Sequence, residues 1–416
     1  MTQAETGPPV TTADDAASSG TLSGYVRLWW QGVRAGELGS LPILVGIALI
    51  LLTFAVLQDN FFSARNFTNL LLQMAAIATI AIGIVFVLLT AEIDLSVAFV
   101  SAVGGVVMTL LLRPDDPGWP WWLAVGFALL CTTAIGFLHG VIVTKAGVPS
   151  FVVTLAGFLV WSGVVLILTT QYSTAGTIRI QNQTVVGIAN DFLSAPVGWT
   201  VGALVVVGFA AGQVRTAFTS RARGLVAKPN SLLALQIAGL AAITFAAVSY
   251  ANQDRGVPKV ALILGILLAF WSFVATRTRF GRHVYAVGGN PEAARRAGID
   301  VDRVKIAVFM ISGFMAGLGG IVIASRLRSV ATGQGGGNLL LLVIAAAVIG
   351  GTSLFGGTGR VIAALLGALV IASIQNGMDL MGLASGTKFV ITGLVLLGAV
   401  LVDAYAKRRR AAAGGV

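Results

Sequence analysis

Charged residues are scarce in this sequence. Asp, Glu, Lys and Arg together make up only 10% of its 416 residues, against about 25% in soluble domains. Hydrophobic residues make up 56%, and the mean hydropathy is +0.91. Because so few polar side chains cannot cover a water-facing surface, the composition excludes a water-soluble globule. It indicates a chain whose main solvent is the lipid bilayer.

Residues that build covalent and metal sites are equally rare. The single cysteine, Cys131, excludes a disulfide framework and a cysteine-based metal site. The two histidines, His139 and His283, are not in a ligand spacing, and we expect His139, in an apolar stretch, to be a hydrogen-bonded helix residue. No phosphate-binding loop occurs either, because the glycines from Gly351 to Gly357 are not followed by lysine. The sequence thus predicts no catalytic residues and no bound metal or cofactor.

Long apolar runs dominate the rest of the chain. A bilayer core of about 30 Å requires roughly 20 apolar residues in a helix, and we predict an all-α, polytopic transmembrane helical bundle of 10–12 spans. The short segments 97–112 and 338–352 are typical of interrupted or re-entrant helices inside a bundle. The twelve candidate spans are 41–57, 68–90, 97–112, 119–143, 148–170, 197–214, 232–250, 259–276, 305–325, 338–352, 361–378 and 386–404.

The net charge of +11 is distributed unevenly along the chain. If the N-terminus is cytoplasmic and the twelve segments alternate, 19 of the 27 Lys and Arg residues fall on the cytoplasmic side, as the positive-inside rule requires. We therefore expect a multi-pass protein of the inner membrane with both termini in the cytoplasm and the cation-poor loop 171–196 outside. No nucleic-acid partner is needed to explain the positive charge.

Composition also divides the chain into parts. Residues 1–40 are predicted to form a disordered cytoplasmic tail and lead-in, since the first 24 residues are polar and lack the basic residues of a signal peptide. Residues 41–406 form the predicted transmembrane domain. Residues 407–416 form a basic cytoplasmic tail.

Two stretches of the chain repeat a common plan. Residues 75–112 pass from one small-residue helix through 90–96 into another, and residues 343–374 do the same through a break at 350–357. Paired interruptions in two halves of a membrane protein point to a translocation path. The alternative is chance similarity between helices that are rich in glycine and alanine.

The basic loop 277–304 carries the clearest local signals. Asn290 suits an N-cap and Pro291 the first position of a helix. Glu292 would lie in the first turn, where the helix dipole favours an anion. These residues predict that a short helix of about seven residues begins here, between two membrane spans.

The same helix has a predicted end. Arg295 lies toward its C-terminus, and Gly298 can adopt the left-handed conformation that terminates a helix. A simple connecting loop needs no start and stop signals, so we interpret the segment as a docking element. Ala293 and Ala294 would present the small surfaces that close docking requires.

At these residues the chain resembles a known family. Glu292-Ala293-Ala294 followed by Gly298 is similar to the Glu-Ala-Ala-x-x-x-Gly signature of ABC importer permeases. Over roughly 41–406 the chain resembles the ribose/xylose/galactose-type sugar permeases, and an added two-span segment at about 197–258 resembles the xylose type. The stretches that carry this resemblance are 92–97, 148–155, 280–291, 350–359 and 375–378.

This resemblance implies a membrane-spanning permease subunit of an ATP-binding cassette importer, which translocates a monosaccharide by alternating access. A pentose such as xylose is the implied substrate. In the family, the segment matching 290–298 is a coupling helix that docks into a cleft of the ATPase subunit. The implied partners are an ABC ATPase that uses ATP and Mg, an extracytoplasmic sugar-binding protein and a second permease copy in a homodimer.

Four residues are candidates for a translocation path. Because a charge in mid-bilayer is unfavourable by about 2.5–3.5 kcal/mol, Asp94 with Ser96 either lines a wet path or caps the helix that follows. The neighbouring Glu92 is expected at the cytoplasmic end of a span, either solvated or capping the helix that follows. Gln375 and Asn376, near the outer end of a span, either contact the sugar or satisfy neighbouring helices.

Two other functions stay open from the sequence. An ion-coupled secondary transporter of a small polar solute would need ionisable coupling residues within its spans, and these are nearly absent. A membrane enzyme acting on lipid would need a nucleophile or a metal cluster, and none is evident in the sequence. Binding of an ATPase subunit separates the importer from both.

Overall fold

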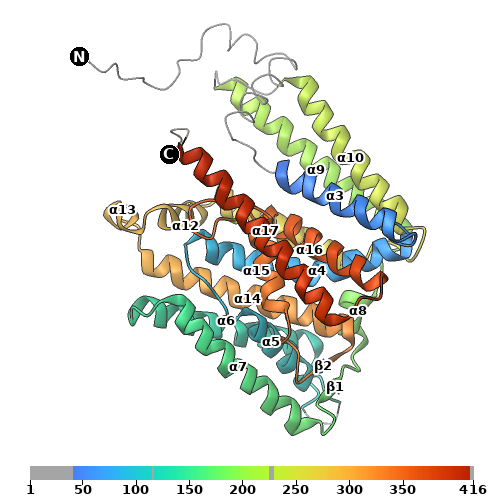
Figure 1. The fold of residues 1–416 in the computed structure, drawn as a ribbon, viewed down its shortest axis with the longest axis vertical. Coiled ribbons are helices and arrows are strands. Elements are labelled where there is room, and N and C mark those ends of the chain that lie inside the picture. The colour runs from blue at the N-terminus through green and yellow to red at the C-terminus, as the bar shows by residue number, and fades with distance from the viewer. Residues whose placement is uncertain (1–40, 115–116, 224–228, 413–416) are drawn as a thin grey trace. The chain divides into compact units, whose positions relative to one another are not determined.

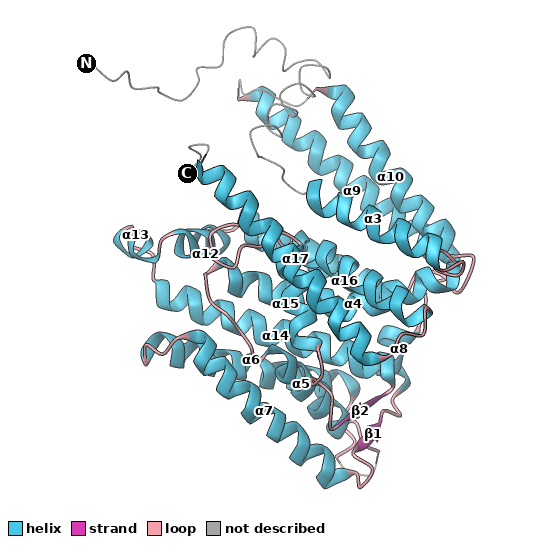
Figure 2. Ribbon diagram, viewed as in Figure 1, coloured by secondary structure: helices cyan, strands magenta, loops and turns pink. Residues whose placement is uncertain are grey.

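The computed structural model describes residues 41–114, 117–223 and 229–412, so the predicted tail at 1–40 lies outside the described residues. The described part is helical apart from one pair of short strands (Figures 1 and 2). Contacts divide the chain into two units. The larger unit comprises Ser40–Leu193 and Val257–Asp403, and the smaller one contains Ser194–Gly256 together with the two ends of the chain.

The larger unit is a bundle of helices of very different lengths. Two of its short helices, α5 and α15, each begin only a few residues after the preceding helix or strand ends. Its helices are α3 (Leu41–Leu57), α4 (Ala64–Leu89), α5 (Val97–Leu111), α6 (Trp121–Lys145), α7 (Ser150–Tyr172), α8 (Gln183–Asn190), α11 (Lys259–Arg277), α12 (Arg279–Gly289), α13 (Pro291–Arg296), α14 (Val301–Leu327), α15 (Leu339–Ile349), α16 (Ile362–Leu380) and α17 (Ser385–Ala412), the last of which leaves the unit after Asp403.

The smaller unit contains two long apolar helices, α9 (Ala195–Ala222) and α10 (Asn230–Ala251). Gly202 of α9 allows close packing, because a Cβ there would lie 3.3 Å from Val248 of α10. Only 11% of the apolar window of each helix is buried. Such largely exposed apolar helices are suited to a lipid environment.

All twelve predicted spans coincide with helices, and the predicted polytopic all-α bundle is confirmed. Within the described residues, eight helices are long and apolar enough to cross a membrane. The segments predicted to be interrupted are short helices, 15 residues in α5 and 11 in α15. The basic residues 407–410 continue α17.

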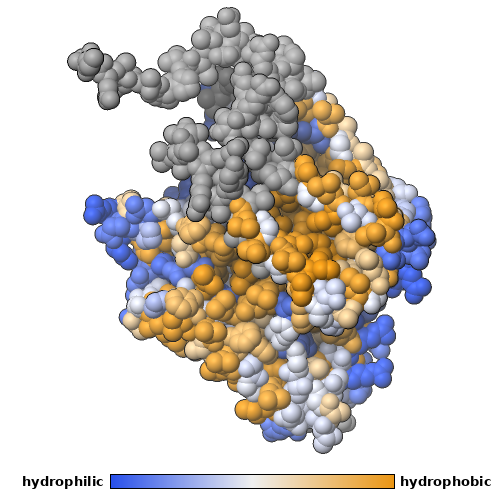
Figure 3. Space-filling view, viewed as in Figure 1, coloured by the Kyte–Doolittle hydropathy of each residue, from blue (hydrophilic) through white to orange (hydrophobic). Residues whose placement is uncertain are grey.

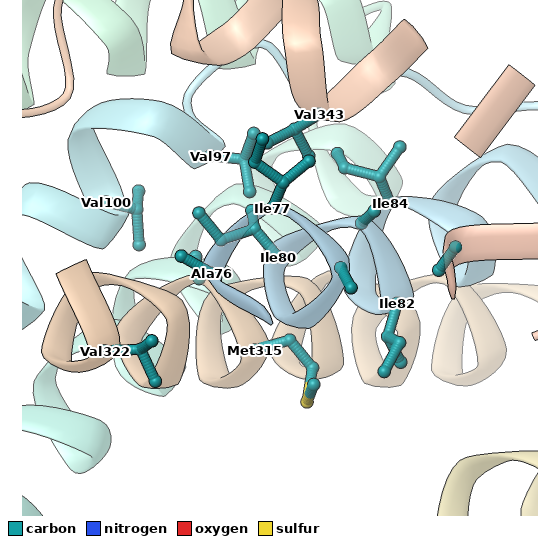
Figure 4. Packing of buried hydrophobic residues seen from close by; sticks show 14 of the residues in the cluster. Ala76, Ile77, Ile80, Ile82, Ile84, Val97, Val100, Met315, Val322 and Val343 are labelled. Atoms are coloured by element: carbon teal, nitrogen blue, oxygen red, sulfur yellow. The ribbon is translucent and has the colours of Figure 1, made fainter. Parts of the chain in front are cut away.

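Helices α4 and α14 lie at the centre of the larger unit. In α4, 89% of the apolar window is buried, and in α14 61% is buried. Figure 4 shows Ile77 of α4 beside Val343 of α15, and Met315 on the neighbouring helix α14; all three residues belong to one hydrophobic cluster. A helix that is apolar on all sides is buried on all sides. The helices that surround α4 and α14 provide the neighbours that this burial requires.

Glycine brings the backbones of these helices together. A Cβ at Gly320 of α14 would overlap the carbonyl oxygen of Ser101 in α5, and one at Gly313 would overlap the carbonyl oxygen of Thr132 in α6. In lipid, where apolar burial gives little drive, such close approach is a main source of helix association. The glycines of α14 are therefore packing positions.

The surface of the larger unit separates into apolar and polar regions. Figure 3 shows hydrophobic residues over α7 and hydrophilic residues around α13. The strands β1 (Thr177–Arg179) and β2 (Ser329–Ala331) pair antiparallel and join the loop after α7 to the loop after α14. The exposed apolar residues of α7 include Phe151, Val152, Leu155, Leu159, Val160, Leu166 and Ile167.

Candidate functional site

The predicted docking helix is present as α13. The side chain of Asn290 accepts a hydrogen bond from the backbone N–H of Ala293 at 2.9 Å, and Pro291 occupies the first turn. Glu292 pairs with Arg295 at 3.2 Å, so an anion lies at the N-terminal end and a cation toward the C-terminal end. This arrangement matches the helix dipole and fixes a helix of only six residues.

The end of α13 is fixed by a Schellman motif. Gly298 has a φ of +82°, its N–H donates to Arg295 O at 3.0 Å, and the N–H of Ile299 donates to Ala294 O at 3.0 Å. Both bonds satisfy carbonyls that a helix end leaves free. The loop therefore contains a rigid helix with Ala293 exposed on its surface.

Ala294 does not present its side chain to a partner as the sequence suggested. It is 4% exposed and belongs to the hydrophobic core of the larger unit, because α13 packs against the start of α14. A large residue at Ala294 would thus disturb the chain's own packing. Of the two alanines, only Ala293 is available for docking.

Glu92 is not solvated, which corrects the prediction for this residue. Its side chain is only 12% exposed and forms an ion pair with Lys305, near the start of α14. The pair connects the interruption after α4 to the N-terminal end of α14. A largely buried pair of opposite charges in this position satisfies both groups without a ligand.

Asp94 lies inside the bundle, 4% exposed, and accepts three hydrogen bonds. Its Oδ1 accepts from the N–H of Ser96 at 3.0 Å and from Ser96 Oγ at 2.6 Å. Its Oδ2 accepts from Ser312 Oγ of α14 at 2.6 Å. Asp94 therefore forms an Asx-type turn that holds Ser96, the N-cap of α5, and it also joins this turn to α14. Among the described residues no Lys or Arg forms an ion pair with Asp94.

His139 of α6 and Trp161 of α7 extend this group of polar side chains. The indole N–H of Trp161 can only donate, so Nε2 of His139 accepts its bond at 3.3 Å. Nδ1 then carries the proton of a neutral imidazole and donates to Ser96 Oγ at 3.3 Å. One neutral tautomer thus satisfies every bond, and the prediction that His139 is a hydrogen-bonded helix residue is confirmed.

Asn376 belongs to a different contact. It is 2% exposed and pairs with Asn66 at the start of α4, each side-chain amide donating to the other at 2.9 Å and 2.7 Å. Asn66 also donates to Phe61 O at 2.8 Å. The amide of Asn376 thus satisfies a neighbouring helix, the second of the two predicted roles, and Gln375 beside it is half-buried.

The four predicted path residues do not form one site. Asn376 contacts the first turn of α4, whereas Asp94 follows its last turn. The 26 residues of α4 span about 39 Å at 1.5 Å per residue. Asp94 with Ser96 and Gln375 with Asn376 are therefore two separate groups near opposite ends of the bundle.

The structure also adds residues that the sequence did not single out. Ser312, Trp161 and Asn66 complete the two polar groups. Ser312 and Asn66 lie 218 and 310 residues along the chain from their partners, whereas Trp161 lies on the helix that follows the helix of His139. The only signal for these residues in the sequence was the presence of serine, tryptophan and asparagine within apolar helices. Among the described residues, no three His, Cys, Asp or Glu side chains come together as metal ligands would.

Known proteins share this sequence over most of its length. Residues 66–402 match the family described as branched-chain amino acid transport system / permease component. The chain belongs to this permease family. The permease is 38% identical to the xylose transport system permease protein XylH of Escherichia coli over 382 residues, which are 91% of this chain and 95% of that protein.

Two further relatives support the assignment. The permease is 35% identical to XylH of Haemophilus influenzae, over 88% of this chain and 96% of that protein. It is 32% identical to the ribose import permease protein RbsC of Escherichia coli, over 86% of this chain and 92% of that protein. No solved structure matches the permease. The chain is therefore a multi-pass membrane permease and not an enzyme.

Proposed function

We propose that this permease is the membrane-spanning subunit of an ATP-driven importer of a monosaccharide. The observation that carries the proposal is α13, a rigid, capped helix that presents Ala293 on a loop between the spans α11 and α14. A rigid exposed helix with one small side chain is suited to docking against a partner protein. The relatives named as sugar transport permeases, which cover about nine-tenths of the chain, give this docking element its context.

A pentose such as xylose is the proposed substrate. The relatives named for xylose are 38% and 35% identical to this chain, and the one named for ribose is 32% identical. Xylose and ribose are both five-carbon sugars. The sugar would pass through the bundle by alternating access, in which the permease opens to one side of the membrane at a time.

Three partners belong to this proposal. An ATPase subunit would dock at α13 and would bind and hydrolyse ATP with Mg, because the sequence contains no phosphate-binding loop of its own. A sugar-binding protein outside the membrane would deliver the substrate. A second copy of the permease would complete the pathway as a homodimer.

We place both termini in the cytoplasm and the permease in the inner membrane. The distribution of Lys and Arg supports this orientation, and contacts between loops agree with the alternation of spans. Segments expected on the same side of the membrane contact each other. The contacts between segments expected in the cytoplasm are Lys145–Asp302, Leu89–Gly357 and Tyr285–Gly359, and those between segments expected outside are Thr177–Ala331, Asn66–Asn376 and Asp191–Lys259.

Reporter fusions test this orientation. Fusions at Arg223, His283 and Arg408 are expected to report the cytoplasm, and a fusion at Asn182 is expected to report the outside. A cytoplasmic signal at Asn182 would contradict the arrangement, since it would place β1 and α8 on the same side as α13.

Uptake of labelled xylose tests the function itself. Cells that contain the permease with its ATPase and binding protein are expected to accumulate xylose while ATP is maintained, also after an uncoupler has collapsed the proton gradient. Loss of uptake at constant ATP would instead indicate an ion-coupled transporter. Labelled ribose and glucose in the same cells show whether pentoses are preferred.

A further inference from the structure

The interruption after α4 begins with a tightly closed helix end. The N–H of Ala91 donates to Leu88 O at 2.9 Å, and the N–H of Glu92 donates to Val87 O at 3.2 Å. Ala91 has a φ of +59°, a left-handed conformation that is uncommon for a residue with a side chain. These bonds form a Schellman motif and leave the carbonyl of Leu89 without a partner inside its own helix.

The interruption after α15 begins in the same way. The N–H of Gly351 donates to Val348 O at 2.9 Å, and the N–H of Thr352 donates to Ala347 O at 3.1 Å. Gly351 has a φ of +102° and takes the position that Ala91 has after α4. The two interruptions thus share one cap geometry, although they are more than 250 residues apart in the numbering.

The two interruptions are bonded to each other. The free carbonyl of Leu89 accepts a hydrogen bond from the N–H of Gly357 at 3.0 Å. Gly356 lies next to Ala91, since a Cβ at Gly356 would lie 2.8 Å from the Ala91 side chain. We call this contact, formed by residues 89–91 and 356–359, the break junction.

Helix α12 packs directly on the break junction. A Cβ at Gly288 would overlap the carbonyl oxygen of Leu89 and would lie 2.7 Å from the N–H nitrogen of Gly357. The hydroxyl of Tyr285 donates to Gly359 O at 2.9 Å. Burial raises the pKa of the Tyr285 phenol, so this hydroxyl stays protonated and keeps its role as a donor.

Helix α12 is also tied to the docking helix. Asn290 is the only residue between α12 and α13, and it is both the C-cap of the first and the N-cap of the second. Val284 and Val287 of α12 are fully buried, so the helix is held as a rigid part of the bundle surface. A displacement of α13 therefore cannot be absorbed by a flexible linker before it reaches α12.

We propose that α12 transmits movement of the docked ATPase to the break junction, with Gly288 and Tyr285 as the positioning residues that hold the contact. The inference rests on the proposed function, because it requires an ATPase at α13. It assigns a role to α12 that the docking helix alone does not explain. Movement at the break junction would act on both interrupted helix pairs at once, because Leu89 and Gly357 bond one pair to the other.

The experiment measures sugar uptake per ATP hydrolysed in proteoliposomes that contain the permease, its ATPase subunit and the binding protein. Gly288→Ala forces a methyl group against Leu89 O. Gly289→Ala is the matched control one residue further, where a Cβ meets nothing within 4 Å. Tyr285→Phe removes only the hydroxyl and tests the inference with little risk to folding.

We expect Gly288→Ala to retain the bound ATPase and its ATP hydrolysis but to lower uptake per ATP at least about tenfold. Tyr285→Phe should lower it about 2- to 10-fold, the range for the loss of one hydrogen bond. Gly289→Ala should show the same uptake per ATP as the native chain. Normal coupling in both Gly288→Ala and Tyr285→Phe would overturn the inference, as would loss of the ATPase from both. Failure of the native permease to bind an ATPase would overturn the proposed function itself.

Discussion

Removing the Asp94 carboxylate is expected to destabilise the contact between the interruption after α4 and helix α14. Two of its three hydrogen bonds go to Ser96 and hold the start of α5. The third, from Ser312 Oγ at 2.6 Å, is the bond that joins distant helices. A double-mutant cycle of Asp94→Ala and Ser312→Ala isolates the energy of that third bond.

Its magnitude follows from the environment of the bond. Hydrogen bonds between membrane helices contribute about 0.6 kcal/mol on average and up to about 1.7 kcal/mol. A charged acceptor strengthens a hydrogen bond, so we expect a coupling energy of about 1–2 kcal/mol. Asp94→Ala alone should lower the free energy of unfolding by about 2–4 kcal/mol, because it leaves the buried N–H and hydroxyl of Ser96 without their acceptor.

The assay is reversible unfolding in mixed micelles by titration with dodecyl sulfate. Ser101→Ala is the matched control, because Ser101 is also fully buried but its hydroxyl donates within its own helix, to Ala98 O at 2.6 Å. Its effect should add to that of Asp94→Ala within about 0.5 kcal/mol. The reasoning would be refuted if the coupling energy between Asp94 and Ser312 were no larger than the coupling energy measured between Asp94 and Ser101.

Further substitutions test two other contacts. Gly298→Val is expected to lower xylose uptake in proteoliposomes at least about tenfold, because a β-branched residue resists a φ of +82°; Gly298→Asn, which tolerates that conformation, should keep most of it. Asn66→Ala and Asn376→Ala should each lower the free energy of unfolding by about 1–3 kcal/mol, because each leaves a buried amide unpaired. The double variant should lose little more unfolding free energy than either single variant. Full additivity in the same titration would contradict a hydrogen-bonded pair.

Local signals in the sequence were sufficient for the spans and for α13. A run of about 15 or more mostly apolar residues predicts a spanning or buried helix. The capping residues Asn290 and Gly298 act on backbone atoms only a few residues away. Helix α12 was not predicted, because Gly281 and Gly288 are residues that usually weaken a helix. Gly281 and Gly288 are explained only by the backbones packed against them.

Contacts between distant residues set the limit of prediction. Asp94 and Ser312 are 218 residues apart in sequence, and Asn66 and Asn376 are 310 apart, so no local pattern could pair them. The orientation of Ala294 likewise depends on how α13 packs against α14, which the spacing of small residues does not reveal. Motif and caps therefore located α13, while the structure decided which of its faces remains exposed.

Capture of an ATPase by α13 is the most direct test of the proposed function. Ala293→Trp places a large side chain on the exposed face of α13 without touching the bundle, and Ala146→Trp places the same side chain on the exposed loop after α6 as a control. When the tagged permease is purified from cells that make the ATPase subunit, we expect Ala293→Trp to be as abundant as the native chain and to retain at most about a tenth of the ATPase, while Ala146→Trp retains all of it. Undiminished capture by Ala293→Trp would contradict docking at α13.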